Sequence, residues 1–230
     1  MRIHLIRHGE TDHNVAKRIQ GPLIDDPLNA RGRQQSEALE ARYLAERARG
    51  ARLAAVYASP LKRAWETAEA VARAMGLPRV EPMPAMVEFS WGIYLGKVET
   101  PDVVAKMREI HERWRRGDLA HAPPEGESPL SAWRRAREGL APAFERHKGE
   151  EIAVVAHGRI NKIALARMVR GDLSRMEEFP QGNTAVTILE HDDDAPFDDA
   201  WRLIVLNDTS HLRGVGRAGG TAAEGEPPLV

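Results

Sequence analysis

The segment from Glu151 to Ala156 constrains the fold most strongly, because residues 152–156 (IAVVA) form one continuous apolar run. A strand with such a run, without alternation, is buried on both faces, which is typical of parallel sheets covered by helices on both sides. The run stops at His157-Gly158, and a helix is predicted over residues 160–169. This succession of strand, turn and helix predicts an α/β structure.

The rest of the chain repeats the same alternation of strands and helices. Short apolar segments predict further strands over residues 3–6, 53–58, 79–82, 184–189 and 202–206. Helices are predicted over residues 30–49, 61–75, 102–116 and 129–147. Together these elements predict a three-layer α/β fold with a mostly parallel central sheet flanked by helices.

Two segments do not follow this alternation. Prolines and glycines interrupt residues from about 83 to 128, around one polar helix, which predicts a small lid insertion over a site rather than another layer of core. Residues 214–230 are rich in Gly, Pro and Glu without periodicity and predict a disordered tail. We therefore expect a single domain over residues 1–213.

Composition excludes several classes of function. A formal net charge of -1 gives no overall basic field for nucleic acid or an anionic membrane, and the basic clusters at 113–116 and 134–137 are interpreted as solvated helix faces. The absence of cysteine excludes disulfides, thiolate metal sites and cysteine nucleophiles. No apolar run approaches the length of a membrane-spanning helix, and the first residues do not resemble a signal peptide. We expect a cytoplasmic protein without nucleic-acid or membrane partners.

Four charged or titratable residues follow predicted strands. Arg7 and His8 follow the first strand, Arg63 lies just past the second, and His157 ends the buried strand. Ligands of such sheets bind beyond the carboxyl ends of the strands, so these side chains are expected to converge. Each residue alone is weak evidence, since a lone histidine at a strand end is more often a satisfied polar residue than a nucleophile.

A dianionic phosphoryl group is the natural ligand for two guanidinium groups and two imidazoles. Arginine binds it with a planar fork that keeps its charge. A neutral imidazole can attack phosphorus and form a covalent phosphohistidine. Its other ring nitrogen must then be a donor held by a carbonyl group.

Six stretches of the chain resemble the histidine phosphatase superfamily, in the branch that includes the cofactor-dependent phosphoglycerate mutases. The first is residues 5–11, LIRHGET. The others follow in the family's order and are residues 27–32 (PLNARG), residues 59–68 (SPLKRAWETA), Glu88 with Gly92 and Gly96, residues 126–128 (GES) and residues 154–158 (VVAHG). The resemblance spans about residues 2–206 and implies a phosphoglycerate mutase-like fold.

The resemblance also implies catalytic roles. His8 would accept the phosphoryl group, and Arg7, Arg63 and His157 would bind the phosphoryl oxygens. Glu88 would be the general acid that protonates the leaving oxygen and then helps to activate water. An exposed lid carboxylate is the alternative reading of Glu88, with Glu81 and Glu99 as the fallback candidates for the acid.

Four further residues are implied on the substrate side. Asn14 matches the family's phosphate-contacting asparagine, and Gln20 with Gly21 matches its substrate-side loop. Gly158 follows the second histidine and is expected beside the substrate.

Two departures from the family pattern bear on the substrate. Tyr94-Leu95 stands where many relatives carry another acidic residue, and Arg159 stands where relatives often carry something smaller. Arg159 either extends the positive charge toward a second anionic group or caps a helix surface. Arginines of the predicted lid are a further candidate source of preference for a multiply anionic substrate, namely Arg108, Arg113, Arg115 and Arg116.

No metal or other cofactor is expected. The remaining histidines lack the close spacing of a zinc site, namely His111, His121, His147, His191 and His211. Residues 192–194 (DDD) are interpreted as a turn between strands rather than a magnesium site.

The sequence therefore predicts a metal-independent phosphomonoesterase that hydrolyses a small phosphorylated metabolite through a phosphohistidine at His8. A phosphoglycerate mutase is the alternative, disfavoured because residues 97–127 are short and lack the mutase pattern. A catalytically weak phospho-ligand binding protein is a further alternative, disfavoured by the complete catalytic set. The small phosphorylated substrate is the one partner expected. The oligomeric state stays open, with a homodimer as one possibility.

Overall fold

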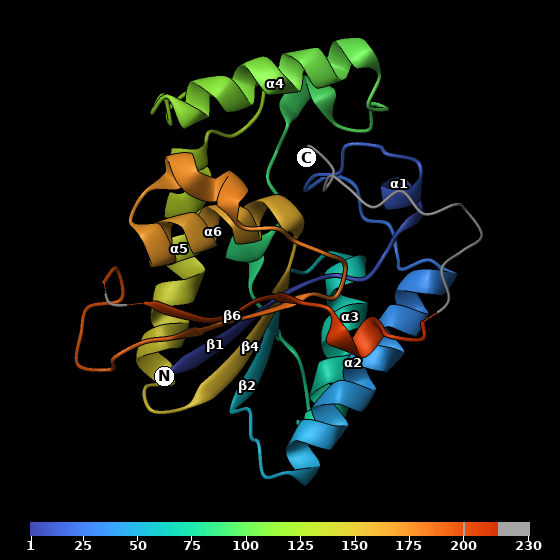
Figure 1. Cartoon of the computed structure of the whole chain (residues 1–230), viewed down its shortest axis with the longest axis vertical. Helices are drawn as coiled ribbons and strands as arrows, with labels where there is room; N and C mark the ends of the chain where they lie inside the picture. The colour runs from blue at the N-terminus through green and yellow to red at the C-terminus, as the bar shows by residue number, and fades with distance from the viewer. Residues whose placement is uncertain (200, 216–230) are drawn as a thin grey trace.

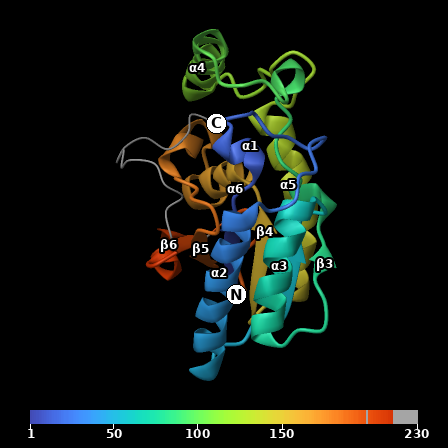
Figure 2. The same cartoon turned by 90° about the vertical axis from the view of Figure 1, so that its right-hand side faces the viewer.

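A six-stranded mixed sheet forms the centre of the molecule. The structure is a computed structural model that describes residues 1–199 and 201–215. Its strands run in the order β3-β2-β4-β1-β5-β6, and Figure 2 shows β3 and β6 toward opposite edges. Their bounds are β1 (Arg2–Arg7), β2 (Ala55–Ala58), β3 (Glu81–Pro82), β4 (Glu151–Ala156), β5 (Val186–Glu190) and β6 (Arg202–Asp208).

The sheet is mostly parallel, as predicted. Strands β3, β2, β4 and β1 pair in parallel, whereas β5 runs antiparallel to both of its neighbours. Residue Arg7 at the end of β1 lies opposite Ala156 at the end of β4. The residues that follow these two strands are therefore adjacent in space.

Helices cover both faces of the sheet, which confirms the three-layer fold. Helices α2 (Ala30–Ala48) and α3 (Lys62–Met75) lie on one face, and α5 (Pro129–Arg146) and α6 (Gly158–Arg170) lie on the other (Figure 1). The side chains of strand β4 pack against the helices on both faces of the sheet. Ala153 and Val155 pack with α2 and α3, whereas the alternate residues Ile152 and Val154 pack with α5 and α6. The apolar run thus reflects burial on both faces.

Local capping chemistry sets the helix ends. The side chain of Asn29 accepts a hydrogen bond from the backbone N–H of Gly32 and caps α2. Gly76 ends α3 in the left-handed conformation, at φ +70°. The short helix α1 (Asp12–Val15) was not predicted, because its four residues are too few to show a helical period.

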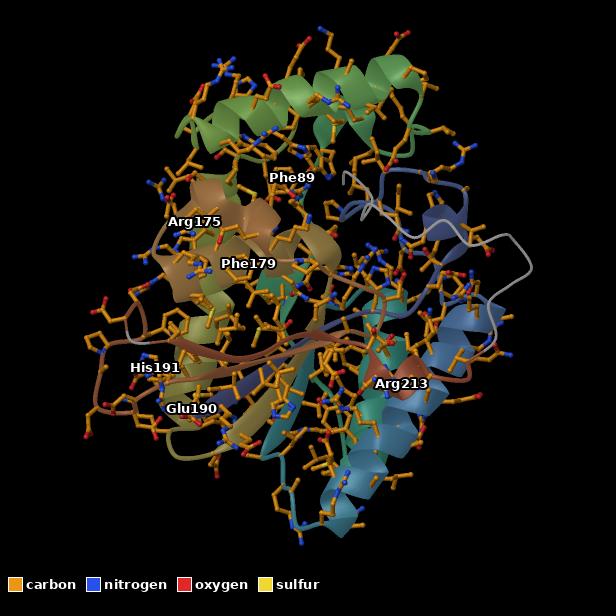
Figure 3. The ribbon with its side chains drawn as sticks, viewed as in Figure 1. Phe89, Arg175, Phe179, Glu190, His191 and Arg213 are labelled. Atoms are coloured by element: carbon orange, nitrogen blue, oxygen red, sulfur yellow. The ribbon has the colours of Figure 1, made fainter. Side chains whose placement is uncertain are left out.

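The segment from residue 83 to 128 holds η1 (Pro84–Met86), η2 (Gly92–Tyr94) and α4 (Pro101–Arg115). Helix α4 lies beyond the carboxyl ends of the parallel strands (Figure 1). Seven apolar side chains of the segment are buried in the same cluster as α5 and α6, namely Met83, Met86, Phe89, Trp91, Met107, Ile110 and Trp114. Figure 3 shows Phe89 between α4 and α6. The segment thus adds side chains to the existing core without forming another layer, a contribution that was not predicted because these apolar residues follow neither a helical nor a strand period.

Two further predictions concern the ends and exterior of the chain. The predicted disordered tail, residues 214–230, lies almost entirely outside the described residues. Over residues 1–199 and 201–215, the helices are too short or too polar to cross a membrane.

Candidate active site

Two histidines form the floor of the site at the carboxyl ends of β1 and β4. His8 follows β1, and its backbone N–H donates to the carbonyl of Ala156, at 3.0 Å. His157 follows β4, and the centroids of the two imidazole rings lie 5.1 Å apart. Arg63 joins them from the first turn of α3, just after β2. The predicted convergence of three strand ends on one site is confirmed.

The tautomer of His8 suits a nucleophile. Its Nδ1 lies 2.6 Å from the carbonyl oxygen of Gly9, and a carbonyl only accepts hydrogen bonds, so Nδ1 carries the proton. The lone pair is therefore on Nε2. Burial lowers the pKa of His8 well below its ordinary value, and the charges of Arg63 and Arg7 lower it further. His8 is thus a neutral imidazole at physiological pH, held by a carbonyl group as predicted.

Hydrogen bonds also fix the tautomer of His157. Nε of Arg63 donates to Nδ1 of His157 at 3.2 Å, so the proton of this imidazole is on Nε2, which donates to Oγ of Ser59 at 2.8 Å. Burial, followed by the charge of Arg63, lowers the pKa of His157 well below its usual range. Both histidines are uncharged, so the positive charge of the site resides on the arginines.

Arg63 is fully buried in contact with His157. Its two Nη atoms donate to the carbonyls of Ile24 and Gly21, and burial lowers its pKa to about 10, so it stays charged near neutral pH. Three of its five N–H groups are engaged by the protein, which leaves two for a ligand.

Arg7 reaches the cavity from the end of β1. Its Nη1 donates to the carbonyl of Gln181 at 2.6 Å. Gly158 lines the cavity next to Arg7, and a Cβ atom there would make ordinary van der Waals contact with Nε of Arg7, at 3.4 Å. Burial lowers the pKa of Arg7, and the carboxylate of Glu88 raises it again.

Asn14 and Gln20, which were predicted on the substrate side, line the cavity. Asn14 Oδ1 accepts from the backbone N–H of Thr11 at 3.1 Å, and Gln20 Nε2 donates to the Thr11 hydroxyl at 2.6 Å. Gly21 does not line the cavity. A Cβ atom there would lie 2.2 Å from the side chain of Leu95, so Gly21 serves the close packing of the two loops.

Glu88 is buried at the start of α6. Its carboxylate accepts from the backbone N–H groups of Phe89 (2.8 Å), Ile160 (3.0 Å) and Arg159 (3.3 Å). It lines the cavity, so the alternative of an exposed lid carboxylate was wrong. Of the two other candidates for the general acid, Glu99 lines the cavity. Glu81 does not line it, because it lies on β3, where it forms an ion pair with Arg146.

The cavity has a volume of about 360 Å³. Of the predicted catalytic set, Arg7, His8 and Glu88 line it, whereas Arg63 and His157 are fully buried and do not line it. The sequence prediction missed its other polar lining residues, namely Glu10, His13, Lys17, Arg18, Gln181, Asn183 and Asn207.

Comparison with known proteins identifies the family. The model of the histidine phosphatase superfamily (branch 1) matches residues 3–209. The chain belongs to the histidine phosphatase superfamily. Phosphoglycerate mutase-like protein 4 of Arabidopsis thaliana is 33% identical over 217 residues, covering 93% of this chain and 88% of the relative. The metal-independent phosphoserine phosphatase of the same plant is 32% identical over 216 residues, covering 93% and 84%.

A solved structure agrees with the sequence relatives. The mycobacterial glucosyl-3-phosphoglycerate phosphatase superimposes with a TM-score of 0.76 at 26% identity, covering 90% of this chain and 98% of that one. The family and its phosphatase members show that this chain is a phosphatase, a hydrolase of phosphate esters.

Arg159 of this histidine phosphatase is 1% exposed and lines the cavity wall. Its guanidinium carbon lies 5.2 Å from the ring centroid of Trp91, and its Nη1 forms an ion pair with Glu177. Its Nη2 donates to Nε2 of His111 at 3.1 Å. Burial lowers the pKa of His111 to about 3, so this imidazole is neutral and accepts the hydrogen bond. The interpretation of Arg159 as a helix-surface cap was wrong.

The arginines of α4 do not reach the cavity. Arg108, Arg113, Arg115 and Arg116 are exposed, and Arg113 pairs with Asp118 at 2.6 Å. The structure therefore gives no support to a role for them in choosing a multiply anionic substrate.

Arg135 differs from the solvated face predicted for residues 134–137. It is partly buried, its Nη1 donates to the carbonyls of Ala85 and Val87, and its Nε donates to Glu127. Arg135 thereby fixes the backbone just before Glu88.

Residues 181–183 line the cavity, and their position in the sequence before a strand could have indicated this. They precede the antiparallel strand β5, which begins at the edge where the parallel strands end. Asn183 Nδ2 donates to the carbonyl of His8 at 3.1 Å. Because β5 is antiparallel, the polar residues that precede it lie at the same edge of the sheet as the residues that follow β1.

The histidines outside the floor do not form a metal site. Across the residues with described positions, there is no group of three or more histidine or acidic side chains arranged to hold a metal ion. Residues 192–194 form a turn after β5, as predicted, in which Asp193 accepts from the backbone N–H of Gly149.

Proposed function

We propose that this phosphatase is a metal-independent phosphomonoesterase that hydrolyses a small phosphorylated metabolite through a phosphohistidine at His8. The observation that carries the proposal is the hydrogen bond from Nδ1 of His8 to the carbonyl of Gly9, which directs the lone pair to Nε2. A neutral, pre-oriented imidazole beside two guanidinium groups meets the requirements for attack on phosphorus.

The reaction needs two displacements. Nε2 of His8 attacks phosphorus, and the ester oxygen leaves with a proton from Glu88, which enters this step as a carboxylic acid and becomes a carboxylate. Water then attacks the phosphohistidine, and Glu88 takes a proton from that water. Phosphate departs, His8 returns to its neutral form, and Glu88 is protonated again. The net reaction converts ester and water to alcohol and phosphate.

Guanidinium groups take the electrostatic role that a metal ion plays in other phosphatases. Arg7 and the two available N–H groups of Arg63 offer positive charge to the transferring phosphoryl oxygens. Arg63 itself is fully buried and does not line the cavity, so direct donation from these N–H groups requires a shift of the surrounding side chains when the ester binds. The name of a metal-independent relative supports this reading, and a cavity of about 360 Å³ suits a small ester.

A mutase would use the same floor but return the phosphoryl group to the substrate. The phosphoglycerate mutase names of several relatives keep this alternative relevant. The short stretch from residue 97 to 127 favours hydrolysis over transfer. In a catalytically weak binding protein we would expect some of the catalytic residues to be replaced. Here the predicted catalytic set is complete at or next to the cavity, namely His8, Arg7, Arg63, His157 and Glu88.

The test is phosphate release from a panel of phosphate esters in EDTA, by the wild type and by His8→Ala. We expect release in EDTA, lowered by at least about 10⁴-fold in His8→Ala, as for loss of nucleophiles in other enzymes. His121→Ala, which alters a histidine outside the cavity, is the matched control and should retain activity.

Other outcomes would overturn parts of the proposal. Loss of activity in EDTA that a divalent ion restores would contradict metal independence. Interconversion of 2- and 3-phosphoglycerate with little release of phosphate would establish the mutase. Binding of esters by folded protein without turnover of any of them would establish the binding protein.

A further inference from the structure

Two loops pair to form the mouth of the cavity. Residues 17–19, after α1, run antiparallel to residues 96–99, after η2, with a bridge between Arg18 and Val98. The backbone N–H of Ile19 donates to the carbonyl of Lys97 at 3.0 Å, and that of Glu99 donates to the carbonyl of Lys17, also at 3.0 Å. Lys17 and Glu99 thus lie opposite each other in the pairing.

Lys17 occupies an unusual backbone conformation. Its φ is +47°, in the left-handed region that favours glycine. Hydrogen bonds from its N–H to the carbonyl of Asn14 and from Glu99 to its own carbonyl hold it there. Such strain costs on the order of 1 kcal/mol and is found preferentially at functional sites. The side chain lines the cavity and, over the described part of the chain, forms no ion pair.

Glu99 brings the opposite charge to the same wall. It is half-buried and lines the cavity, and its carboxylate forms neither an ion pair nor a hydrogen bond with any residue whose position is described. Burial raises the pKa of Glu99 and the charge of Lys17 lowers it again, so the two groups interact electrostatically. Because no ion pair forms between them, a ligand cation would compensate this partly desolvated carboxylate further.

The other charges near the mouth are already engaged. Arg18 donates to the carbonyl of Gly96, and Glu10 accepts from Asn29. His13 pairs with Asp26. Lys17 and Glu99 are therefore the two oppositely charged lining side chains that form neither an ion pair nor a hydrogen bond with a described residue.

We propose that Lys17 and Glu99 bind the carboxylate and the ammonium group, respectively, of a phosphorylated amino acid whose phosphoryl group lies at His8. This assignment of substrate class rests on the proposed function. A zwitterionic head group satisfies both side chains at once, whereas a second phosphate would be attracted by Lys17 and repelled by Glu99. Both are specificity residues, since they contact the part of the substrate that does not react.

Four esters separate the two contributions. O-phospho-L-serine carries both head groups, 3-phosphoglycerate carries only the carboxylate, phosphoethanolamine carries only the ammonium group, and glycerol 3-phosphate carries neither. The wild type is expected to give the highest kcat/KM on phosphoserine and the lowest on glycerol 3-phosphate. A hydrogen bond to a charged group is worth roughly 1.5–3 kcal/mol, so each head group should contribute about tenfold or more.

Two isosteric variants test each contact. Lys17→Gln should lower kcat/KM for the two carboxylate-bearing esters about tenfold relative to the other two. Glu99→Gln should lower it by a similar factor for the two ammonium-bearing esters relative to the other two. Thermal melting of both variants checks that they fold, because a folding defect would lower all four rates together.

The outcomes distinguish this inference from the proposed function. Equal kcat/KM for all four esters, or variants that lower all four by one factor, would overturn the inference. Better hydrolysis of 3-phosphoglycerate by Glu99→Gln than of phosphoserine by the wild type would also overturn it. Each of these leaves hydrolysis through His8 intact. Failure of the wild type to hydrolyse any of the four would count against the proposed function, and the inference would fall with it.

Discussion

The floor and the mouth of the cavity are built differently. On the floor, His8, Arg63 and His157 are at most 2% exposed, and each donates or accepts hydrogen bonds that fix its orientation. At the mouth, the exposed Lys17 and the half-buried Glu99 line the cavity on a short pairing of two loops. A change at the floor therefore disrupts packing, tautomers and charge together. A change at the mouth alters a side chain that little else depends on, so the substrate can change while the chemistry stays.

The largest contrast is expected from one conservative substitution in each region. Arg63→Lys should lower kcat about 100- to 1000-fold, because one ammonium group cannot serve His157, the loop carbonyls and the phosphoryl group together. Arg18→Lys at the mouth should change kcat by less than about fivefold, since among the described residues its side chain donates only to a loop carbonyl. Steady-state kinetics on one ester measures both. Similar losses in the two variants would remove the distinction between floor and mouth.

The floor should also make stability depend on pH. His8 and His157 have depressed pKa values when folded, so between about pH 6.5 and their folded pKa values the unfolded chain binds more protons. The free energy of unfolding should thus fall as pH drops below about 6.5, by up to about 1.4 kcal/mol per pH unit for each histidine.

Urea unfolding at several pH values between about 7 and 5 measures this dependence. His8→Gln removes one of the two groups and should give a shallower slope, whereas Lys17→Gln at the mouth should keep the wild-type slope. A slope that His8→Gln leaves unchanged would mean that His8 is not held neutral.

The smallest effect is expected from the strained backbone of the mouth. Lys17→Gly should raise the free energy of unfolding by about 0.5 kcal/mol, because glycine adopts a positive φ without strain. Arg18→Gly is the matched control next to it and should lower stability by about 0.5–1 kcal/mol, since glycine loses more conformational freedom there. Thermal unfolding of both variants gives the comparison. A loss of stability in Lys17→Gly as large as in Arg18→Gly would show that Lys17 is not strained.

The floor could be predicted from the sequence because topology alone places it. Parallel strands that end in Arg7-His8 and His157 bring these residues to one edge of the sheet, whatever the loops do. The apolar run of β4 and the caps at Asn29 and Gly76 are likewise local signals, and the structure contains all three.

The mouth could not be predicted because it depends on pairing between distant loops. Lys17 and Glu99 are separated in sequence, and neither belongs to a helix or strand with a readable period. Arg159 shows the same limit. Its burial depends on Trp91, His111 and Glu177, which come from three different segments. No pattern around residue 159 alone reveals that environment.

Trapping the phosphoenzyme tests the central claim most directly. After rapid mixing with a hydrolysable ester and quenching in alkali, where phosphohistidine survives, tryptic peptides are analysed by mass spectrometry. We predict a phosphoryl group on His8, in the peptide that begins after Arg7, formed at least as fast as turnover and absent from His8→Ala. A phosphoryl group on His13 or on another residue, or turnover that persists in His8→Ala without any adduct, would contradict the account.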